Sequence, residues 1–214
     1  MGVVSIGVID LGIQDYEETY RAMREFNEQR DASTEDQIWL LEHKPVYTLG
    51  LTDKTEHLLN TADIPVIKTD RGGQVTYHGP GQLIAYLLID LKRRPYAIKK
   101  LVSLMESAVI EYLHDCGIKS ERKSGAPGVY VGGEKIAALG VRVKKGCTYH
   151  GLALNIDMDL KPFTGINPCG YEGLICTQLI NYKKDMSVTK VKKSFSTYLV
   201  KHLDQSDNVL SDVA

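Results

Sequence analysis

Residues 71–91 read RGGQVTYHGPGQLIAYLLIDL, a glycine-rich stretch that leads directly into an apolar one. From Gln82 to Leu91 the apolar residues are nearly continuous. A strand with one face in water would instead alternate apolar and polar side chains, so this run is typical of a β-strand that is covered on both faces. The segment therefore predicts a strand inside a sheet, and the segments around it indicate what covers that sheet.

Shorter segments on either side of this run resemble strands and helices. Apolar residues at helical spacing predict helices over about residues 15–30, from residue 98 to just before Gly117, and after Ser187, which is a good helix-capping residue. The pair Gly132-Gly133 between two apolar segments predicts a tight hairpin. Further strands are expected at residues 3–10, 37–42, 46–49, 66–69, 118–121, 128–131, 135–143 and 148–157.

The whole chain favours one α/β domain over residues 1–214, with helices covering a mixed, mostly antiparallel sheet and a frayed tail at about residues 205–214. A net charge of −1 gives no support to nucleic acid or an anionic membrane as partner. We find no targeting segment and no apolar stretch near the ~20 residues that span a bilayer. The four cysteines form no CxxC pair and the six histidines show no zinc-ligand spacing, so we expect free thiols, a cytoplasmic protein and no metal site.

The glycine-rich half of the opening stretch is the densest candidate binding segment. Glycines allow a backbone to approach a ligand closely and leave N–H groups free to contact it. A tight structural loop before a buried strand is the alternative, but this loop also carries a cation, a hydroxyl and an imidazole, from Arg71, Thr76 and His78. We therefore favour a binding loop. Neither a Walker A pattern nor GxGxxG is present, so nothing here indicates nucleotide phosphates.

Lys135 enters an apolar strand directly after the Gly132-Gly133 turn. At most hairpins such a lysine projects into water. If the strand instead carries it into an apolar cleft, burial lowers its pKa from about 10.4 and makes it a proton acceptor. The small residues that follow it would let an aliphatic chain pass close to the strand, although strand packing explains them equally well.

Of the four cysteines, Cys169 stands apart. Cys176 lies in an apolar run and is typical of a core residue, Cys116 ends a helix, and Cys147 lies in a turn. Pro168 and Gly170 predict a turn that exposes the Cys169 thiol. A thiol becomes a good nucleophile when a nearby cation stabilises its thiolate, and Lys135 is a candidate for that cation or, when neutral, for the base. The sequence alone does not bring the two residues together.

Three stretches, in this order, resemble the lipoyl(octanoyl) transferase family, also called octanoyl-acyl carrier protein:protein transferases. They are RGGQVTYHGPGQL at residues 71–83, GEKIAALGVRV at 133–143, and HGLALNI followed by INPCG between 150 and 170. DLGIQDYEETY at residues 10–20 is also similar to that family, so the resemblance covers nearly the whole chain.

The resemblance implies the fold of the biotin and lipoate protein ligases and a ping-pong acyl transfer without ATP or another cofactor. Cys169 would take an octanoyl, or lipoyl, group from the phosphopantetheine thioester of acyl carrier protein. A specific lysine of a lipoyl domain would then accept it, on E2 subunits of 2-oxo acid dehydrogenases or on the glycine-cleavage H protein. Lys135 matches the lysine that promotes thiolate formation. The family's acyl pocket maps to Arg71, Gly72, Gly73, Gln74, Val75, Thr76, Tyr77, His78, Ala138, Leu139, Gly140, Gly151, Leu152 and Ala153.

Three alternatives remain. An ATP-dependent lipoate–protein ligase shares the implied fold and a matching lysine, but it resembles an RRxxGGGxVFHD-type loop and needs no cysteine nucleophile. An amidotransferase that moves lipoyl groups between proteins typically places its nucleophile elsewhere in the chain. A non-catalytic module that binds acyl groups or carrier proteins would not require both Cys169 and Lys135. The transferase is therefore the hypothesis that we carry forward.

Overall fold

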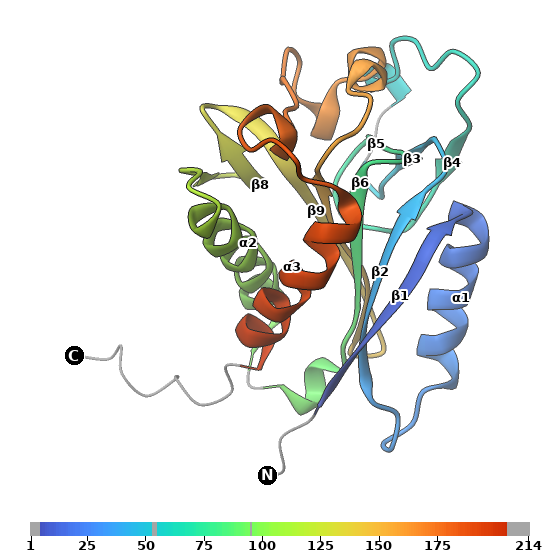
Figure 1. Cartoon of the computed structure of the whole chain (residues 1–214). Coiled ribbons are helices and arrows are strands. Elements are labelled where there is room, and N and C mark those ends of the chain that lie inside the picture. The colour runs from blue at the N-terminus through green and yellow to red at the C-terminus, as the bar shows by residue number, and fades with distance from the viewer. Residues whose placement is uncertain (1–4, 53–54, 95, 205–214) are drawn as a thin grey trace.

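The apolar segment that begins at Gln82 is strand β6, Gln82–Leu88, and it lies inside a seven-stranded sheet in the computed structural model (Figure 1). The structure describes residues 5–52, 55–94 and 96–204. All seven residues of β6 are buried, as the continuous apolar run predicts. In spatial order the strands of this sheet are β1 (Ile6–Gln14), β2 (Asp36–His43), β6, β10 (Cys147–Asn155), β9 (Glu134–Lys144), β8 (Ala126–Val131) and β7 (Glu121–Lys123).

The sheet is mixed and mostly antiparallel, which confirms the expected fold class. Only β1 and β2 pair in parallel, whereas the other five neighbouring pairs are antiparallel. Helix α1, Tyr16–Gln29, provides the crossover that a parallel pair requires. A second sheet of three short strands has the order β4-β3-β5, with β3 at Val46–Leu49, β4 at Val66–Lys68 and β5 at Thr76–His78.

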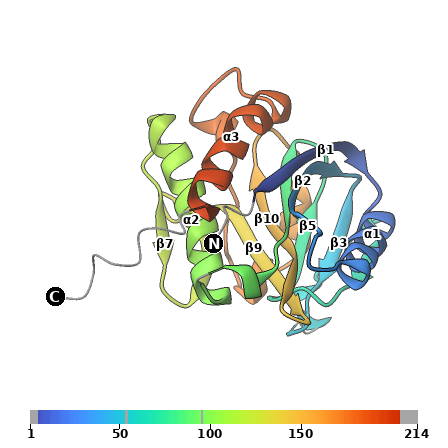
Figure 2. The same ribbon diagram turned by 90° about the horizontal axis from the view of Figure 1, so that it is seen from below.

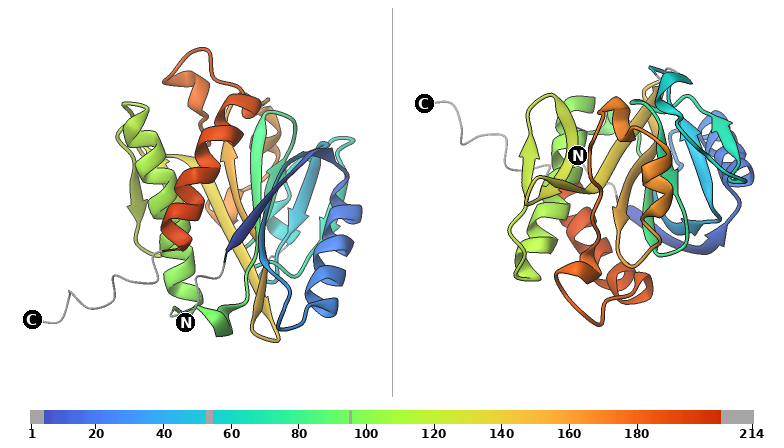
Figure 3. Two further views of the ribbon diagram at one scale, coloured as in Figure 1. Left: turned by 60° about the horizontal axis from the view of Figure 1, so that its bottom comes forward. Right: turned by 90° about the horizontal axis from the view of Figure 1, so that it is seen from above.

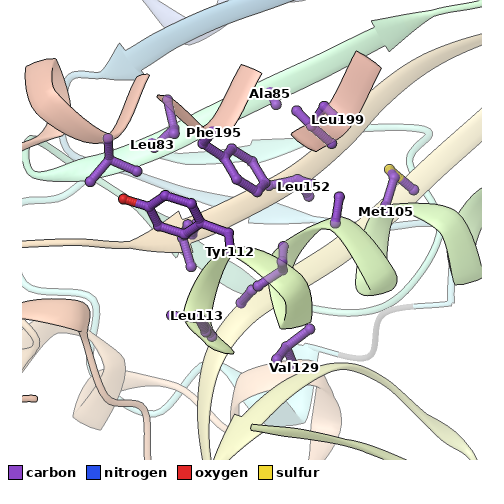
Figure 4. Packing of buried hydrophobic residues seen from close by; sticks show 14 of the residues in the cluster. Leu83, Ala85, Met105, Tyr112, Leu113, Val129, Leu152, Phe195 and Leu199 are labelled. Carbon is purple, nitrogen blue, oxygen red and sulfur yellow. The ribbon is translucent and has the colours of Figure 1, made fainter. Parts of the chain in front are cut away.

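Two helices, α2 (Ile98–Asp115) and α3 (Val188–Leu203), cover one face of the large sheet. The other face is covered by helix α1 and the small sheet (Figure 2). Helices α2 and α3 pack against each other and over β6, β8 and β10. Figure 4 shows the centre of this packing, where Tyr112 of α2 meets Phe195 of α3 edge to face at 5.5 Å between ring centroids. Both faces of β6 are therefore buried against apolar side chains, which supplies the main hydrophobic contribution to the fold.

Helix starts lie where the sequence predicts them. Asp15 caps α1 by accepting hydrogen bonds from the N–H groups of Glu17 and Glu18. Ser187 caps α3 by accepting from Lys190 N–H. Both caps satisfy N–H groups that the first turn of a helix leaves without partners.

One predicted strand is misplaced, and one strand of the structure has no counterpart in the prediction. The expected strand at residues 118–121 is wrong in position: Ile118 is buried under the end of α2, and the edge strand β7 begins only at Glu121. Strand β5 was not predicted, because it lies within the glycine-rich stretch and is only three residues long. Residues 3 and 4 of the expected first strand and the expected frayed tail at residues 205–214 lie outside the described residues.

The segment that follows β10 crosses the end of the large sheet and meets the small sheet (Figure 3, right). Phe163 and Ile166 of this segment pack against Tyr47 and Tyr77 of the small sheet. The turn that carries Cys169 belongs to the same segment, so the fold brings this turn close to the glycine-rich stretch. Among the described residues, no helix is long and apolar enough to cross a membrane.

Candidate active site

Cys169 and Lys135, which are 34 positions apart in the chain, are in direct contact. The Nζ atom of Lys135 lies 3.0 Å from Sγ of Cys169 and donates a second hydrogen bond of 2.9 Å to the carbonyl oxygen of Pro127. The same ammonium lies 5.5 Å from the centroid of the Tyr130 ring. Lys135 is only 3% exposed, so its charge is balanced by these neighbours and hardly by water.

A β-bulge directs Lys135 to this side of the sheet. Strand β9 pairs Ala137 with Val129 and Lys135 with Tyr130 of β8, so β9 has one extra residue, Ile136, between the two pairs. Ile136 and Ala137 both enter the core under α2 and α3. With regular alternation Lys135 would share the face of Ala137 and enter the same core. The bulge instead places the ammonium beside the cysteine.

Backbone hydrogen bonds hold the segment after the cysteine against β9. The N–H of Lys135 donates to the carbonyl oxygen of Ile175, and the N–H of Thr177 donates to the carbonyl oxygen of Lys135, both at 2.9 Å. Residues 175–177 thus run alongside β9 at Lys135 and are joined to it by backbone hydrogen bonds. This contact fixes the distance between the lysine strand and the turn that carries Cys169.

The turn holds Cys169 in a left-handed backbone conformation, with φ of 56° and ψ of 21°. Such a conformation is uncommon for a residue with a side chain and persists only where the surroundings enforce it. Here Pro168 precedes it, Gly170 follows with φ of 75°, and the N–H of Cys169 donates to the carbonyl oxygen of Val75 at 3.0 Å. The hydrogen bond to Val75 ties the turn to the glycine-rich stretch.

The pKa of Lys135 does not follow the direction that burial alone would give it. Burial by itself lowers the pKa of Lys135, but attraction to Cys169 and to Tyr130 outweighs it, so the pKa is raised above its ordinary value. Lys135 is therefore an ammonium at neutral pH. Of the two roles that the sequence left open, the resting structure favours the cation that stabilises a thiolate over the neutral base.

The other three cysteines lie in different surroundings. Burial raises the pKa of the Cys176 thiol to about 12, and burial also raises the pKa of Cys147. Cys116 is the residue that follows the last turn of α2. Only Cys169 has a lysine ammonium in hydrogen-bonding contact with its sulfur among the described residues.

Cys169 lies at the junction of two larger cavities and also lines a small one that reaches Lys135 and Cys176. The first is mainly apolar and extends between the large sheet and the glycine-rich stretch. Its lining consists of Tyr16, Arg71, Gly73, Gln74, Thr76, His78, Ile84, Tyr86, Ala138, Leu139, Gly140, His150, Gly151, Leu152, Ala153 and Cys169. A second, wider cavity reaches Cys169 and Lys135 from the side of α2, past Ile98, Val102, Pro127 and Tyr171.

Most of the predicted pocket residues line the first cavity, and three do not. Val75 and Tyr77 point the other way, into the apolar cluster of the small sheet with Tyr47 and Phe163, because side chains alternate along β5. Gly72 lines the second cavity, where its N–H donates to the carbonyl oxygen of Val141. The glycine-rich stretch therefore separates the two cavities and contributes to both.

Comparison with known proteins identifies the chain's relatives. Residues 15–200 match the model of the lipoyl protein ligase A/B catalytic domain. The octanoyltransferase of Thiobacillus denitrificans is 55% identical over 195 residues, which are 91% of this chain and 89% of that protein. The chain belongs to the octanoyltransferase family. A further member, the octanoyltransferase of Pseudomonas fluorescens, is 52% identical over 94% of both chains.

Solved structures show which known fold the chain adopts. A lipoate-protein ligase A bound with ATP superposes with a TM-score of 0.74 over 92% of this chain and 85% of that one, at 14% identity. Biotin protein ligase from Aquifex aeolicus gives a TM-score of 0.56 over 94% of this chain and 69% of that one, also at 14% identity. At these identities the likeness shows the fold alone.

Besides the predicted polar residues, the first cavity of this octanoyltransferase family member has polar side chains that sequence reasoning missed. Tyr16, Tyr86 and His150 line it, and His43 lies behind them with Nε2 2.7 Å from the Tyr86 hydroxyl. Burial lowers the pKa of His43 to about 4 and lowers the pKa values of His78 and His150 as well, so the three imidazoles are neutral at neutral pH. These residues come from separate elements and carry no common motif, so only the fold reveals the group.

Proposed function

We propose that the protein transfers an octanoyl group to lipoyl domains through a thioester on Cys169. One observation carries the proposal: a buried ammonium lies 3.0 Å from a thiol at the mouth of a mainly apolar cavity. The pair provides an activated nucleophile, and the cavity provides space for an aliphatic chain next to it. Membership of the octanoyltransferase family supports the same reaction.

In the first half-reaction the Cys169 thiolate attacks the carbonyl carbon of a donor thioester. The new C–S bond forms while the carbonyl π electrons move to oxygen, and the tetrahedral intermediate then expels the donor thiolate. The leaving thiolate takes a proton from the Lys135 ammonium, which is buried beside Cys169. The products are the octanoyl-Cys169 thioester, a free donor thiol and a neutral Lys135.

In the second half-reaction the neutral amine of an acceptor lysine attacks the octanoyl-Cys169 thioester. An amide forms, the C–S bond breaks, and Cys169 leaves as a thiolate. The proton that the amine loses passes to neutral Lys135, so the ammonium and thiolate of the starting state are restored. Lys135 thus serves as the acid of the first step and the base of the second.

The second cavity is the route by which both substrates reach Cys169. A donor thioester on the phosphopantetheine arm of acyl carrier protein and the side chain of a lipoyl-domain lysine are both long and thin. The lipoyl domains of the E2 subunits and the glycine-cleavage H protein are the expected acceptors. Ping-pong transfer allows the two carrier proteins to use the same opening in turn, with the acyl chain retained in the first cavity between visits.

The reaction needs no ATP, metal or other cofactor, because a thioester is already an activated acyl donor. An ATP-dependent ligase remains the second candidate, since the lipoate-protein ligase fold is shared. Its chemistry gives no reason for a thiol paired with a buried ammonium, whereas the transferase requires both. All four cysteines are free thiols, which agrees with a reducing cytoplasm as the place of action.

Intact-protein mass spectrometry with peptide mapping tests the proposal. We expect that octanoyl-acyl carrier protein, without ATP, gives a hydroxylamine-labile octanoyl adduct on Cys169 that an unmodified lipoyl domain discharges. If no adduct forms and the lipoyl domain is modified only with ATP and free octanoate, the protein is a ligase and the thioester mechanism is wrong.

A further inference from the structure

The attack on the thioester places negative charge on the carbonyl oxygen, and this oxyanion requires hydrogen-bond donors. In many acyl transfer enzymes the donors are backbone N–H groups beside the nucleophile. Here those groups are occupied. The N–H of Cys169 donates to Val75 at 3.0 Å, that of Gly170 to Asn167 at 2.8 Å, and that of Tyr171 to Pro168 at 3.1 Å, in each case to the carbonyl oxygen.

The side-chain amide of Gln74 lies directly against the nucleophile turn. A Cβ atom added to Gly170 would lie 1.9 Å from Oε1, 2.4 Å from Cδ and 2.6 Å from Nε2 of Gln74. All three amide atoms are therefore packed over the Cα atom of Gly170, the residue after Cys169. This contact explains why position 170 requires glycine, in addition to its positive φ.

The Gln74 amide has no hydrogen-bond partner in the part of the chain that the structure describes. Its Oε1 atom is fully buried and accepts nothing. Buried polar groups are nearly always paired, so an unpaired amide beside a nucleophile needs an explanation. Gln74 also lines both of the cavities that meet at Cys169. Because Oε1 is the buried end of the amide, Nε2 is the end available to a molecule in these cavities.

We propose that the Gln74 carboxamide donates an N–H to the thioester carbonyl oxygen and stabilises the oxyanion in both half-reactions. The inference rests on the proposed acyl transfer and adds a catalytic residue to it. The amide is held in advance by its packing on Gly170, so it needs no reorganisation when charge develops. Lys135 has a different role, because its ammonium contacts Cys169 and Pro127 and gives up a proton to the donor thiolate in the first half-reaction.

The test compares Gln74→Leu and Gln74→Glu with the wild-type protein in two single-turnover reactions of Cys169. The first is acylation by octanoyl-acyl carrier protein, which passes through an oxyanion. The second is alkylation by iodoacetamide, which uses the same thiolate but forms no oxyanion. Gln29→Leu, at an exposed position at the end of α1, controls for the substitution itself.

We expect Gln74→Leu to slow acylation by about 10²–10³-fold at saturating donor, the usual loss for one oxyanion donor, and to leave alkylation unchanged. Gln74→Glu keeps the size of the side chain but cannot donate when ionised, so it should lose at least as much. Acylation of Gln74→Leu at the wild-type rate would overturn the inference. A parallel loss of alkylation would also overturn it, because Gln74 would then act on the thiol itself. Failure of the wild-type protein to form an octanoyl adduct would instead overturn the proposed function, and this inference with it.

Discussion

At the scale of single residues, Cys169 and Cys176 show how surroundings decide reactivity. Both lie next to Lys135, but Cys169 receives a hydrogen bond from its ammonium, whereas burial raises the pKa of Cys176 to about 12. We therefore expect Cys169→Ala to lose octanoyl adduct formation and Cys176→Ala to retain it. Mass spectrometry of the two variants after mixing with octanoyl-acyl carrier protein measures this. An adduct on Cys169→Ala would place the nucleophile elsewhere.

Lys135 gives a prediction about charge. Its ammonium donates a hydrogen bond to Sγ of Cys169 at 3.0 Å. Methionine is similar in length but uncharged, so Lys135→Met removes the ammonium and keeps much of the packing. In Lys135→Met we expect single-turnover acylation by octanoyl-acyl carrier protein to slow by at least about 10²-fold, because the acid of the first step is lost. Acylation of the variant at the wild-type rate would remove Lys135 from this role.

The sequence identifies these two residue types but not their contact. Lys135 and Cys169 lie on separate segments, and hairpin lysines usually project into water. The direction of the lysine pKa was also beyond the sequence, because burial and the neighbouring sulfur act in opposite directions and only their balance decides. The sequence likewise places Gln74 among eight consecutive pocket candidates and gives no reason to single it out. Only the fold shows that its side-chain amide packs on Gly170.

At the scale of secondary-structure elements, the β8–β9 bulge positions the lysine, and Gly128 is the residue that gives it space. Gly128 has φ of 147°, and a Cβ atom there would lie 2.5 Å from Cε of Lys135 and 2.8 Å from the carbonyl oxygen of Ala137. We expect Gly128→Ala to displace the ammonium and to slow acylation by up to about 10²-fold, as misplacement by about 1 Å can do. The single-turnover acylation assay measures this.

Gly132→Ala is the matched control for this prediction. Gly132 has φ of 57° in the adjacent hairpin turn, but a Cβ atom there would meet nothing within 4 Å. Both substitutions impose backbone strain that costs of order 1–3 kcal/mol of stability. Only Gly128→Ala also disturbs the lysine. Equal acylation rates in the two variants would show that the space beside Lys135 is irrelevant to catalysis.

Strand β10 contributes small side chains to the lining of the first cavity, which is the proposed acyl site. Ala153 lines the cavity and is 5% exposed, so a larger side chain at this position occupies space that the acyl chain needs. We expect Ala153→Leu to shift the preference from octanoyl toward shorter donors. Loss of room for two methylene groups at about 0.8 kcal/mol each corresponds to roughly tenfold in kcat/KM. Competition between hexanoyl- and octanoyl-acyl carrier protein measures the ratio, and an unchanged ratio would place the chain elsewhere.

Long periodic elements were predictable from the sequence, and short irregular ones were not. The spacing of apolar residues located α1, α2, α3 and β6, because each buries a continuous face. Strand β5 and the bulge at Ile136 follow from pairing with other segments, which local spacing does not record. The site is built on those irregular elements, so sequence periodicity predicts the scaffold more fully than it predicts the geometry of the site.

At the scale of the whole molecule, three buried histidines in or behind the first cavity link the site to the stability of the fold. His43, His78 and His150 are buried and neutral, and they come from three different strands. Protonation of His43 or His78 in the folded state would place a charge at a buried position, whereas the unfolded chain accepts the same proton freely in water. His150 differs, because its Nε2 atom lies 3.3 Å from a carboxylate oxygen of Asp70. Burial of the histidines around the first cavity therefore predicts a loss of stability in acid.

His43 allows this link to be measured. Its neighbours include Gln14, Asp15, Tyr16, Tyr86 and His150, and burial is the main reason that its pKa falls from 6.5 to about 4, against an opposing attraction to Asp15. Because the folded-state pKa lies below the unfolded value, the stabilisation is fully present above about pH 6.5. It is lost as the pH falls toward 4, by up to about 1.4 kcal/mol per pH unit.

We therefore expect the free energy of unfolding in urea to fall between about pH 6.5 and pH 4 more steeply in the wild-type protein than in His43→Gln, which cannot take up this proton. The slope is the quantity to compare, because the substitution also changes stability at every pH by removing the contacts of His43 with Tyr86 and Gln14. His114→Gln is the control, since the His114 side chain is 84% exposed and its removal should leave the slope unchanged. Equal slopes in His43→Gln and the wild-type protein would mean that His43 does not bind a proton on unfolding. Any acid sensitivity would then come from other groups, among them His78 and His150, which line the first cavity, and carboxyls with a lowered pKa such as Asp70.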